Sequence, residues 1–252
     1  MDTWRTALVK SDATGLWIRG HDIASLMRGA SFTDVIFLLH RGRLPGDGER
    51  RLLDAILVAS ADHGAGAPSC ATARLAASGN RESLSAAVAA GILAIGDVHG
   101  GAGAECMALF DAMATRMARE GLSVDEAARH VVDDARAGGR RVPGIGHRVH
   151  TTDPRVEVLF DLARAVGVAG HGVAAMIAIE RAVALHVKPL PMNIDGALAA
   201  ILHDLGFPPT AGKLLFIVGR VAGLTAEVTE EHTREKPMRI RIPVVYDGEP
   251  PH

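Results

Sequence analysis

Apolar residues recur at helical spacing along most of the chain. In residues 50–63, Leu52, Leu53 and Ile56 fall on one face, as in an amphipathic helix packed on a core. Capping patterns at Ser31 and Ser123 mark the starts of two further segments. The spacing, caps and breaks predict helices over residues 31–43, 50–63, 83–95, 104–120, 123–137, 154–166 and 171–186, one opening at 193, and one over 208–231.

One predicted helix differs from the others because it is apolar almost all round. Residues 83–95 carry no polar stripe, which predicts a central, buried helix. The glycine-rich sequence G-D-V-H-G-G over residues 96–101 then interrupts the helical pattern and places His99 at a junction between helices.

The two ends of the chain follow a different pattern. The first 24 residues lack a helical period and predict a short extended segment or small hairpin, and residues 239–246 alternate as a strand would. Alanine is abundant, aromatic residues make up only 4%, and β-branched runs are few. The prediction is therefore a mainly α fold with minor β at the termini.

Composition and charge exclude several classes of protein. The 252 residues are 48% hydrophobic and 22% charged, which is typical of a folded globular protein. A formal net charge of -2 gives no general attraction to nucleic acid or to an anionic membrane. No window approaches the roughly 20 apolar residues that cross a bilayer, and the N-terminus has no apolar leader. We expect a cytoplasmic protein.

The two cysteines, Cys70 and Cys106, stand alone in alanine-rich stretches. This spacing indicates neither a disulfide framework nor a thiolate metal cluster. Reduced, buried thiols are the expectation.

Three histidines share an unusual setting. His63, His99 and His147 each lie near glycine at a predicted helix break, where backbone can approach a ligand. A single loop histidine is more often structural, but three of them together with Asp195, at the start of a helix, favour a ligand site.

Metal and nucleotide motifs are weak by comparison. His147 and His150 form H-x-x-H, but the surrounding glycine and proline and the lack of a nearby carboxylate at helical spacing disfavour zinc. The glycines before His147 do not open a strand-turn-helix unit, as a dinucleotide fingerprint requires. Neither G-x-S-x-G nor a P-loop occurs. Because the H-x-x-H motif is the one candidate for a metal site and is disfavoured, no metal is expected.

Four segments resemble the citrate synthase superfamily in order and spacing. They read I-G-D-V-H-G-G-A at 95–102, V-P-G-I-G-H-R-V at 142–149 with T-D-P-R at 152–155, P-M-N-I-D-G-A at 191–197, and L-F-I-V-G-R-V-A-G at 215–223. The resemblance covers roughly residues 20 to 235.

Within that superfamily, two short sequence motifs favour lyases. A-D-H-G-A-G-A-P-S at 61–69 and the I-G-D tripeptide are similar to citryl-CoA lyases and to the C-terminal lyase module of ATP-citrate lyase. Full-length synthases carry a histidine-glutamate pair and an asparagine where this chain has His63, Gly64 and Ala65. They also have a longer N-terminal helical region.

The resemblance implies a citrate synthase-like helical fold, with a large and a small domain around a cleft. Residues 1–102 and 206–252 would form a discontinuous large domain, shortened at its N-terminus, and residues 103–205 the small one. It also implies a homodimer or higher homo-oligomer, in which Arg234 or Arg239 of one subunit reaches the site of its neighbour.

The resemblance further implies three catalytic residues. His99 would donate a hydrogen bond to the thioester oxygen, Asp195 would move the methyl proton, and His147 would exchange the proton of the citryl hydroxyl. An enol or enolate needs such partners because its charge is costly in water.

Substrate binding is assigned in the same way. His63, Arg155 and Arg220 would grip the dicarboxylate, for which forked guanidinium groups are suited. Arg220 lies in the apolar run 215–224, where an unpaired charge would be costly.

The other substrate group implied is coenzyme A, as part of the substrate and not as a permanently bound cofactor. The backbone of Val142, Pro143, Gly144, Ile145 and Gly146 would contact its adenine. Arg140 and Arg141 are equally explained as phosphate ligands or as charges that favour a helix C-terminus.

The favoured hypothesis is a citryl-CoA lyase that releases acetyl-CoA and oxaloacetate, with a citryl-CoA synthetase as a supplier of its substrate. Citrate or 2-methylcitrate synthase, which adds thioester hydrolysis, is the alternative. A non-catalytic acyl-CoA-binding protein is the second alternative, and it would be expected to have lost some of His99, His147 and Asp195.

Overall fold

The computed structural model describes residues 3–146 and 153–249. Its elements, in chain order, are β1 (Val9–Asp12), β2 (Gly15–Ile18), β3 (His21–Asp22), α1 (Ile23–Gly29), α2 (Phe32–Arg41), α3 (Asp47–Ser60), α4 (Pro68–Gly79), α5 (Leu84–Leu93), α6 (Ala102–Glu120), α7 (Val124–Ala137), α8 (Pro154–Ala165), α9 (His171–His186), α10 (Ile194–Asp204) and α11 (Ala211–Arg234). The mainly α prediction is confirmed.

Local capping explains where several helices begin. Ser31 accepts a hydrogen bond from the amide of Asp34, whose carboxylate accepts from the amide of Ser31, and Ser123 and Glu126 form the same box before α7. These reciprocal bonds satisfy amides that the first helical turn leaves without a partner. The sequence-based starts at Ser31 and Ser123 are confirmed.

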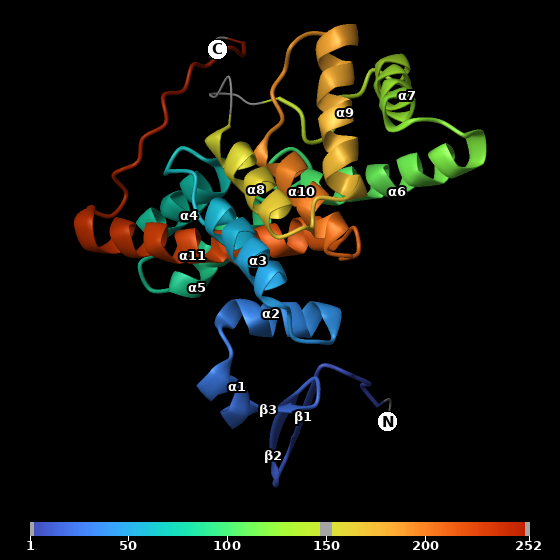
Figure 1. Cartoon of the computed structure of the whole chain (residues 1–252). Coiled ribbons are helices and arrows are strands. Elements are labelled where there is room, and N and C mark those ends of the chain that lie inside the picture. Colours follow the sequence, from blue (N-terminus) through green and yellow to red (C-terminus); the bar gives the residue numbers. More distant parts are fainter. Residues whose placement is uncertain (1–2, 147–152, 250–252) are drawn as a thin grey trace.

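Helix α10 lies at the centre of the core, in contact with α6, α8, α9 and α11 (Figure 1). Leu198, Ile201 and Leu202 are completely buried in it. A helix apolar on every side is stable only when surrounded in this way. The first turn of α10, which carries Asp195, is therefore held on a rigid support.

Two glycines on α11 allow close approach to the end of α3. A Cβ at Gly219 would lie 2.8 Å from the carbonyl oxygen of Leu57, and a Cβ at Gly223 would clash with the carbonyl of Ala61. Their approach leaves Nε of Arg220 2.9 Å from the carbonyl oxygen of Ser60, three residues before His63.

The N-terminal hairpin prediction is confirmed. Strand β1 pairs antiparallel with β2, and β2 with β3, with Val9 opposite Ile18 and Trp17 opposite Asp22. This small sheet and α1 lie apart from the main helical body (Figure 1). Both cysteines are free and buried, as expected.

The prediction of a buried helix over residues 83–95 is wrong. In α5 only Ala87 and Gly91 are buried, whereas Leu84 and Leu93 are 54% and 85% exposed. Helix α5 packs on α4 and α11 by one face, and within the described part of the chain nothing covers its opposite face. Apolar composition alone did not determine its position.

Two further differences concern segments outside the predicted helices. The predicted strand over 239–246 is wrong: this segment leaves the helical body as extended chain without a pairing strand among the described residues (Figure 1). Helix α4 was not predicted, although Pro68 at its first turn is a typical helix start.

No helix within residues 3–146 and 153–249 is long and apolar enough to cross a membrane.

Candidate active site

Ser69 links two of the predicted site residues. Its hydroxyl lies 3.0 Å from Nε2 of His99 and accepts a hydrogen bond from Nη1 of Arg220 at 3.0 Å. Ser69 itself is completely buried at the second position of α4. Sequence reasoning missed this residue, and its only signal was its place just after the proline that opens a helix.

The contacts of His99 define its tautomer. The backbone amide of Ser69 donates to Nε2 at 3.2 Å. Because an amide can only donate, Nε2 must carry the lone pair and Nδ1 the proton. The imidazole therefore offers an N–H donor at Nδ1.

Arg220 is a buried cation enclosed by neutral groups. It is 2% exposed, its Nε donates to the carbonyl of Ser60 at 2.9 Å, and its guanidinium lies 4.9 Å from the ring centre of Phe216. Stacking and hydrogen bonding offset part of the cost of burial but leave the positive charge without a countercharge in these contacts. Such a group is suited to bind a carboxylate.

Asp195 occupies the first turn of α10 and is partly buried. Burial raises the pKa of its carboxyl group to about 6, while the charges of Arg155 and Arg220 act in the opposite direction and that of Asp153 adds to the rise. Arg155 and Arg220 are therefore near enough for their charges to act on Asp195, and the three residues belong to one candidate site. A carboxyl group with this pKa can give or take a proton near neutral pH.

Arg155 lies in the first turn of α8, where its Nε and Nη2 donate to the Asp153 carboxylate at 2.9 and 2.7 Å. Its Nη1 donates to the carbonyl of Ala59 at 3.1 Å, just before the end of α3. The guanidinium is thus fixed in orientation, since three of its nitrogens are held from two elements. Asp153, which also caps α8, was not singled out from the sequence.

The remaining predicted residues are placed less completely. His63 lies three residues beyond α3, with an exposed side chain, in the turn that follows Ser60. His147 lies outside the described residues, as do His150 and Thr152.

The predicted CoA-binding segment, residues 142–146, packs against residues 191–193, which lead into α10. The amide of Gly146 donates to the carbonyl of Pro191 at 2.7 Å, and the amide of Asn193 donates to that of Gly144 at 3.0 Å. The segment is therefore next to Asp195, although it is about 50 residues away in sequence.

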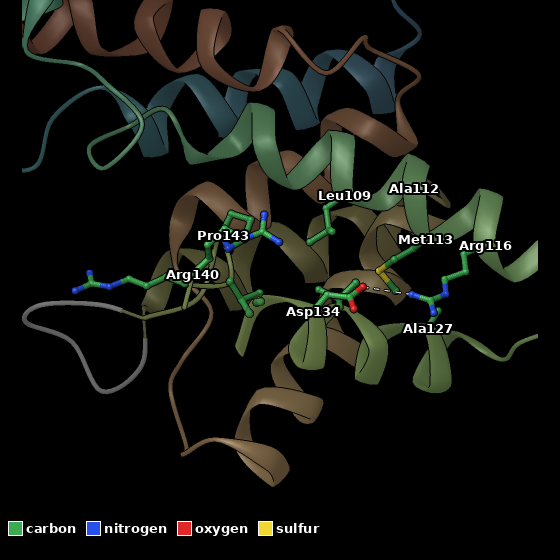
Figure 2. Close-up of a pocket in the computed structure, with 12 residues that line it drawn as sticks. Leu109, Ala112, Met113, Arg116, Ala127, Asp134, Arg140 and Pro143 are labelled. Carbon is green, nitrogen blue, oxygen red and sulfur yellow. Dashed lines mark hydrogen bonds and ion pairs between the residues drawn. The ribbon is translucent and has the colours of Figure 1, made fainter. Parts of the chain in front are cut away.

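A pocket of about 210 Å³ adjoins the same segment, between α6 and α7 (Figure 2). Leu109 and Met113 line it with Val142 and Pro143. Its polar residues are Arg116 and Asp134, which form a 3.3 Å ion pair, with Arg140 and Arg141. An apolar pocket beside arginines can take a flat, apolar ring attached to phosphate.

One group among the described residues has donor atoms close enough for a metal ion: Asp62, Cys70 and Glu227, within 4.8 Å of one another. Glu227 already pairs with Arg74 at 2.5 Å, and burial raises the pKa of the Cys70 thiol, which disfavours the thiolate. This group does not fit a metal ion.

Comparison with known proteins gives the chain its family. Residues 45–241 match the family described as citrate synthase, C-terminal domain. The chain belongs to the citrate synthase family. This family consists of enzymes that form or cleave a carbon-carbon bond, with acetyl-CoA and oxaloacetate as related substrates.

Individual members of the citrate synthase family differ in length. Citrate synthase of Haloferax volcanii is 31% identical over 230 residues, which cover 89% of this chain and 56% of that protein. The chain spans about half the length of the curated relatives it matches. Citryl-CoA lyase from Hydrogenobacter thermophilus is 35% identical to this chain, with a TM-score of 0.88. That match covers 100% of this chain and 97% of that one.

ATP citrate lyase from Methanothrix soehngenii, solved with citrate and coenzyme A, shares the fold alone. It is 20% identical, with a TM-score of 0.79 over 99% of this chain and 42% of that one.

Proposed function

We propose that this protein is a citryl-CoA lyase. The likeness to the Hydrogenobacter lyase, with 35% identity and a TM-score of 0.88 over 100% of this chain and 97% of that one, carries this proposal. The reaction would break the bond between the methylene carbon of citryl-CoA and its hydroxyl-bearing carbon. Oxaloacetate and the enol or enolate of acetyl-CoA would result.

His99 is proposed to stabilise the enolate oxygen. The amide of Ser69 occupies Nε2 and leaves Nδ1–H as the donor of the ring. A fixed donor aimed at a developing negative charge lowers the barrier because it needs no reorganisation during the reaction.

Asp195 is proposed to deliver the proton that completes acetyl-CoA. In the cleavage direction the carboxyl group must be protonated, and a pKa of about 6 keeps part of it so near neutral pH. His147 is proposed to accept the proton of the citryl hydroxyl as the carbon-carbon bond breaks. The electron pair of that bond passes to the methylene carbon, which takes the proton from Asp195.

Three residues are proposed to hold the carboxylates: Arg220, Arg155 and His63. Arg220 supplies a buried positive charge without a carboxylate in its own contacts, which a dicarboxylate would neutralise. Arg155 is oriented by Asp153 and the carbonyl of Ala59. His63 follows Ser60, whose carbonyl accepts from Arg220, by three residues, which supports its inclusion.

Coenzyme A is proposed to bind as part of the substrate along residues 142–146. The pocket beside Val142 and Pro143 has apolar walls that would suit an adenine, and Arg140 and Arg141, which also line it, would pair with phosphates. No permanently bound cofactor is part of this proposal.

A homodimer is proposed through the uncovered face of α5. Leu93 is 85% exposed there, and a helix of this composition is stable when both faces are buried. Division into a large domain (1–102 and 206–252) and a small one (103–205) remains a prediction, as does the cytoplasmic location.

Two arginines predicted to reach a neighbouring subunit bind glutamates of their own chain: Arg234 pairs with Glu230, and Arg239 with Glu231. Their role in a neighbouring site stays a prediction, and so does a citryl-CoA synthetase as a partner.

Citrate synthase is the second candidate, favoured by the 31% identity to a protein of that name. Purified protein is given citryl-CoA in one assay, and acetyl-CoA with oxaloacetate in another. Oxaloacetate and free thiol are followed in both. The proposal predicts oxaloacetate without free CoA in the first assay, whereas free CoA in the second would identify a synthase.

A further inference from the structure

The side chain of Asn193 joins two segments of the site. Its Oδ1 accepts hydrogen bonds from the amides of Asp195 at 3.0 Å and Gly196 at 3.2 Å, which caps α10. Its Nδ2 donates to the carbonyl of Gly146 at 2.9 Å. One amide group therefore holds both the segment that precedes His147 in the sequence and the turn that carries Asp195.

Backbone bonds support the same junction. Residues 144–146 run antiparallel to 191–193, with bonds from Gly146 to Pro191 and from Asn193 to Gly144. On the other side, Oε1 of Glu180 accepts from the amide of Met192 at 2.6 Å. The 191–193 segment is held from both sides, so its position is defined independently of ligand.

The junction also leaves no room for adjustment. A Cβ on Gly144 would lie 2.8 Å from the Cα of Gly196, and a Cβ on Gly196 would lie 2.7 Å from the carbonyl oxygen of Gly144. The two backbones are in direct contact, and Gly144 has φ of 77°, a conformation that favours glycine. Movement of residues 144–146 would therefore be transmitted to the first turn of α10.

We propose that Asn193 is a positioning residue that sets the location of the CoA-binding segment relative to Asp195. This inference rests on the proposed function, in which residues 142–146 bind the thioester substrate and Asp195 delivers its proton. The amide orients both groups through opposite ends, Nδ2 toward the CoA segment and Oδ1 toward the acid. A displacement of about 1 Å between such groups can lower a rate about a hundredfold.

Three variants separate the two ends of the amide. Asn193→Ser retains an oxygen that can cap α10 but loses the donor to Gly146. Asn193→Ala loses both. Asn193→Asp retains the cap and places a negative charge near Asp195. The other asparagine of the chain, Asn80, caps Glu82 and Ser83 at an exposed site and provides Asn80→Ser as the matched control.

In Asn193→Ser we expect the KM for citryl-CoA to rise about tenfold, as for one lost hydrogen bond, with kcat within about threefold of wild type. Asn193→Ala should also lose about tenfold in kcat, because the turn that holds Asp195 is no longer capped. In Asn193→Asp the falling limb of the cleavage rate should move to higher pH, since a neighbouring negative charge raises the pKa of Asp195. Asn80→Ser should match wild type in all three quantities.

Amide exchange of the protein without substrate makes the test independent of turnover. In Asn193→Ser, exchange at Gly146 should speed at least about tenfold while that at Asp195 changes little. Unchanged exchange at Gly146 overturns the proposal, as does a KM equal to wild type in an active enzyme. The predicted exchange in a protein that cleaves no citryl-CoA would instead contradict the proposed function alone.

Discussion

Replacement of Ser69 by alanine tests the link between the oxyanion donor and the substrate-binding arginine. The hydroxyl accepts from Nη1 of Arg220 and contacts Nε2 of His99, both at 3.0 Å. Without it, the buried guanidinium keeps the bond from its Nε to Ser60 and loses the one at Nη1. His99 keeps the bond from the backbone amide but can rotate more freely.

The magnitude follows from the kind of bond that is lost. A hydrogen bond to a charged group contributes about 1.5–3 kcal/mol, so the free energy of unfolding of Ser69→Ala should fall by about 2 kcal/mol. Imprecise placement of His99 and Arg220 should lower kcat/KM for citryl-CoA about tenfold to a hundredfold. Urea unfolding followed by circular dichroism gives the first quantity, and steady-state oxaloacetate release gives the second.

Ser78 provides a control on the same helix. It is 2% exposed, and among the described residues its hydroxyl has no hydrogen-bond partner. Ser78→Ala removes the same atom from a similarly buried position and should change both quantities little, by at most about 0.5 kcal/mol in stability. Equal effects of Ser69→Ala and Ser78→Ala would refute the proposed link.

Further predictions address charge, pH and assembly. Because cleavage needs the protonated Asp195, kcat for citryl-CoA should fall as the pH rises through about 6, and a rate that rises there would contradict the assigned role. Burial raises the folded-state pKa of Asp195 above 3.8, so the stability due to its proton is complete below pH 3.8 and is lost as the pH rises through about 6. Asp195→Asn should therefore be inactive yet more stable than wild type, by about 1–3 kcal/mol at pH 8 and not at pH 3.5, in urea unfolding at both pH values. Arg220→Lys keeps the charge but not the forked geometry and should lower kcat/KM about a hundredfold, whereas Arg119→Lys, at an exposed site, should have no effect in the same assay. Leu93→Glu on the exposed face of α5 should shift the mass in sedimentation equilibrium toward the monomer, while Val158→Glu on α8, also exposed, should not; equal masses would exclude this face as the interface.

The sequence could predict those parts of the fold that local interactions determine. Ser31 and Ser123 predict helix starts because their capping partners lie three residues further along the chain. Asp195 was assigned to a helix start on the same kind of signal, from Asn193. Helix α4 was not predicted because its small residues show little hydrophobic periodicity, although Pro68 marks its first turn.

Features that depend on distant parts of the chain were beyond sequence reasoning. The composition of α5 indicates burial but cannot say whether its own chain or another covers it. Residues 239–246 alternate as a strand does, yet a strand forms only where another pairs with it. Ser69 and Asn193 act through partners 30 and 47 positions away, which no local pattern reveals.

Cleavage of citryl-CoA in deuterium oxide, with products analysed by mass spectrometry, shows whether the protein is a lyase in which Asp195 protonates the enolate. We expect oxaloacetate together with acetyl-CoA that carries one deuterium in its methyl group, no free CoA, and neither product from Asp195→Asn. Wild-type protein that released free CoA, formed acetyl-CoA without deuterium, or left citryl-CoA intact would contradict a lyase that acts through Asp195.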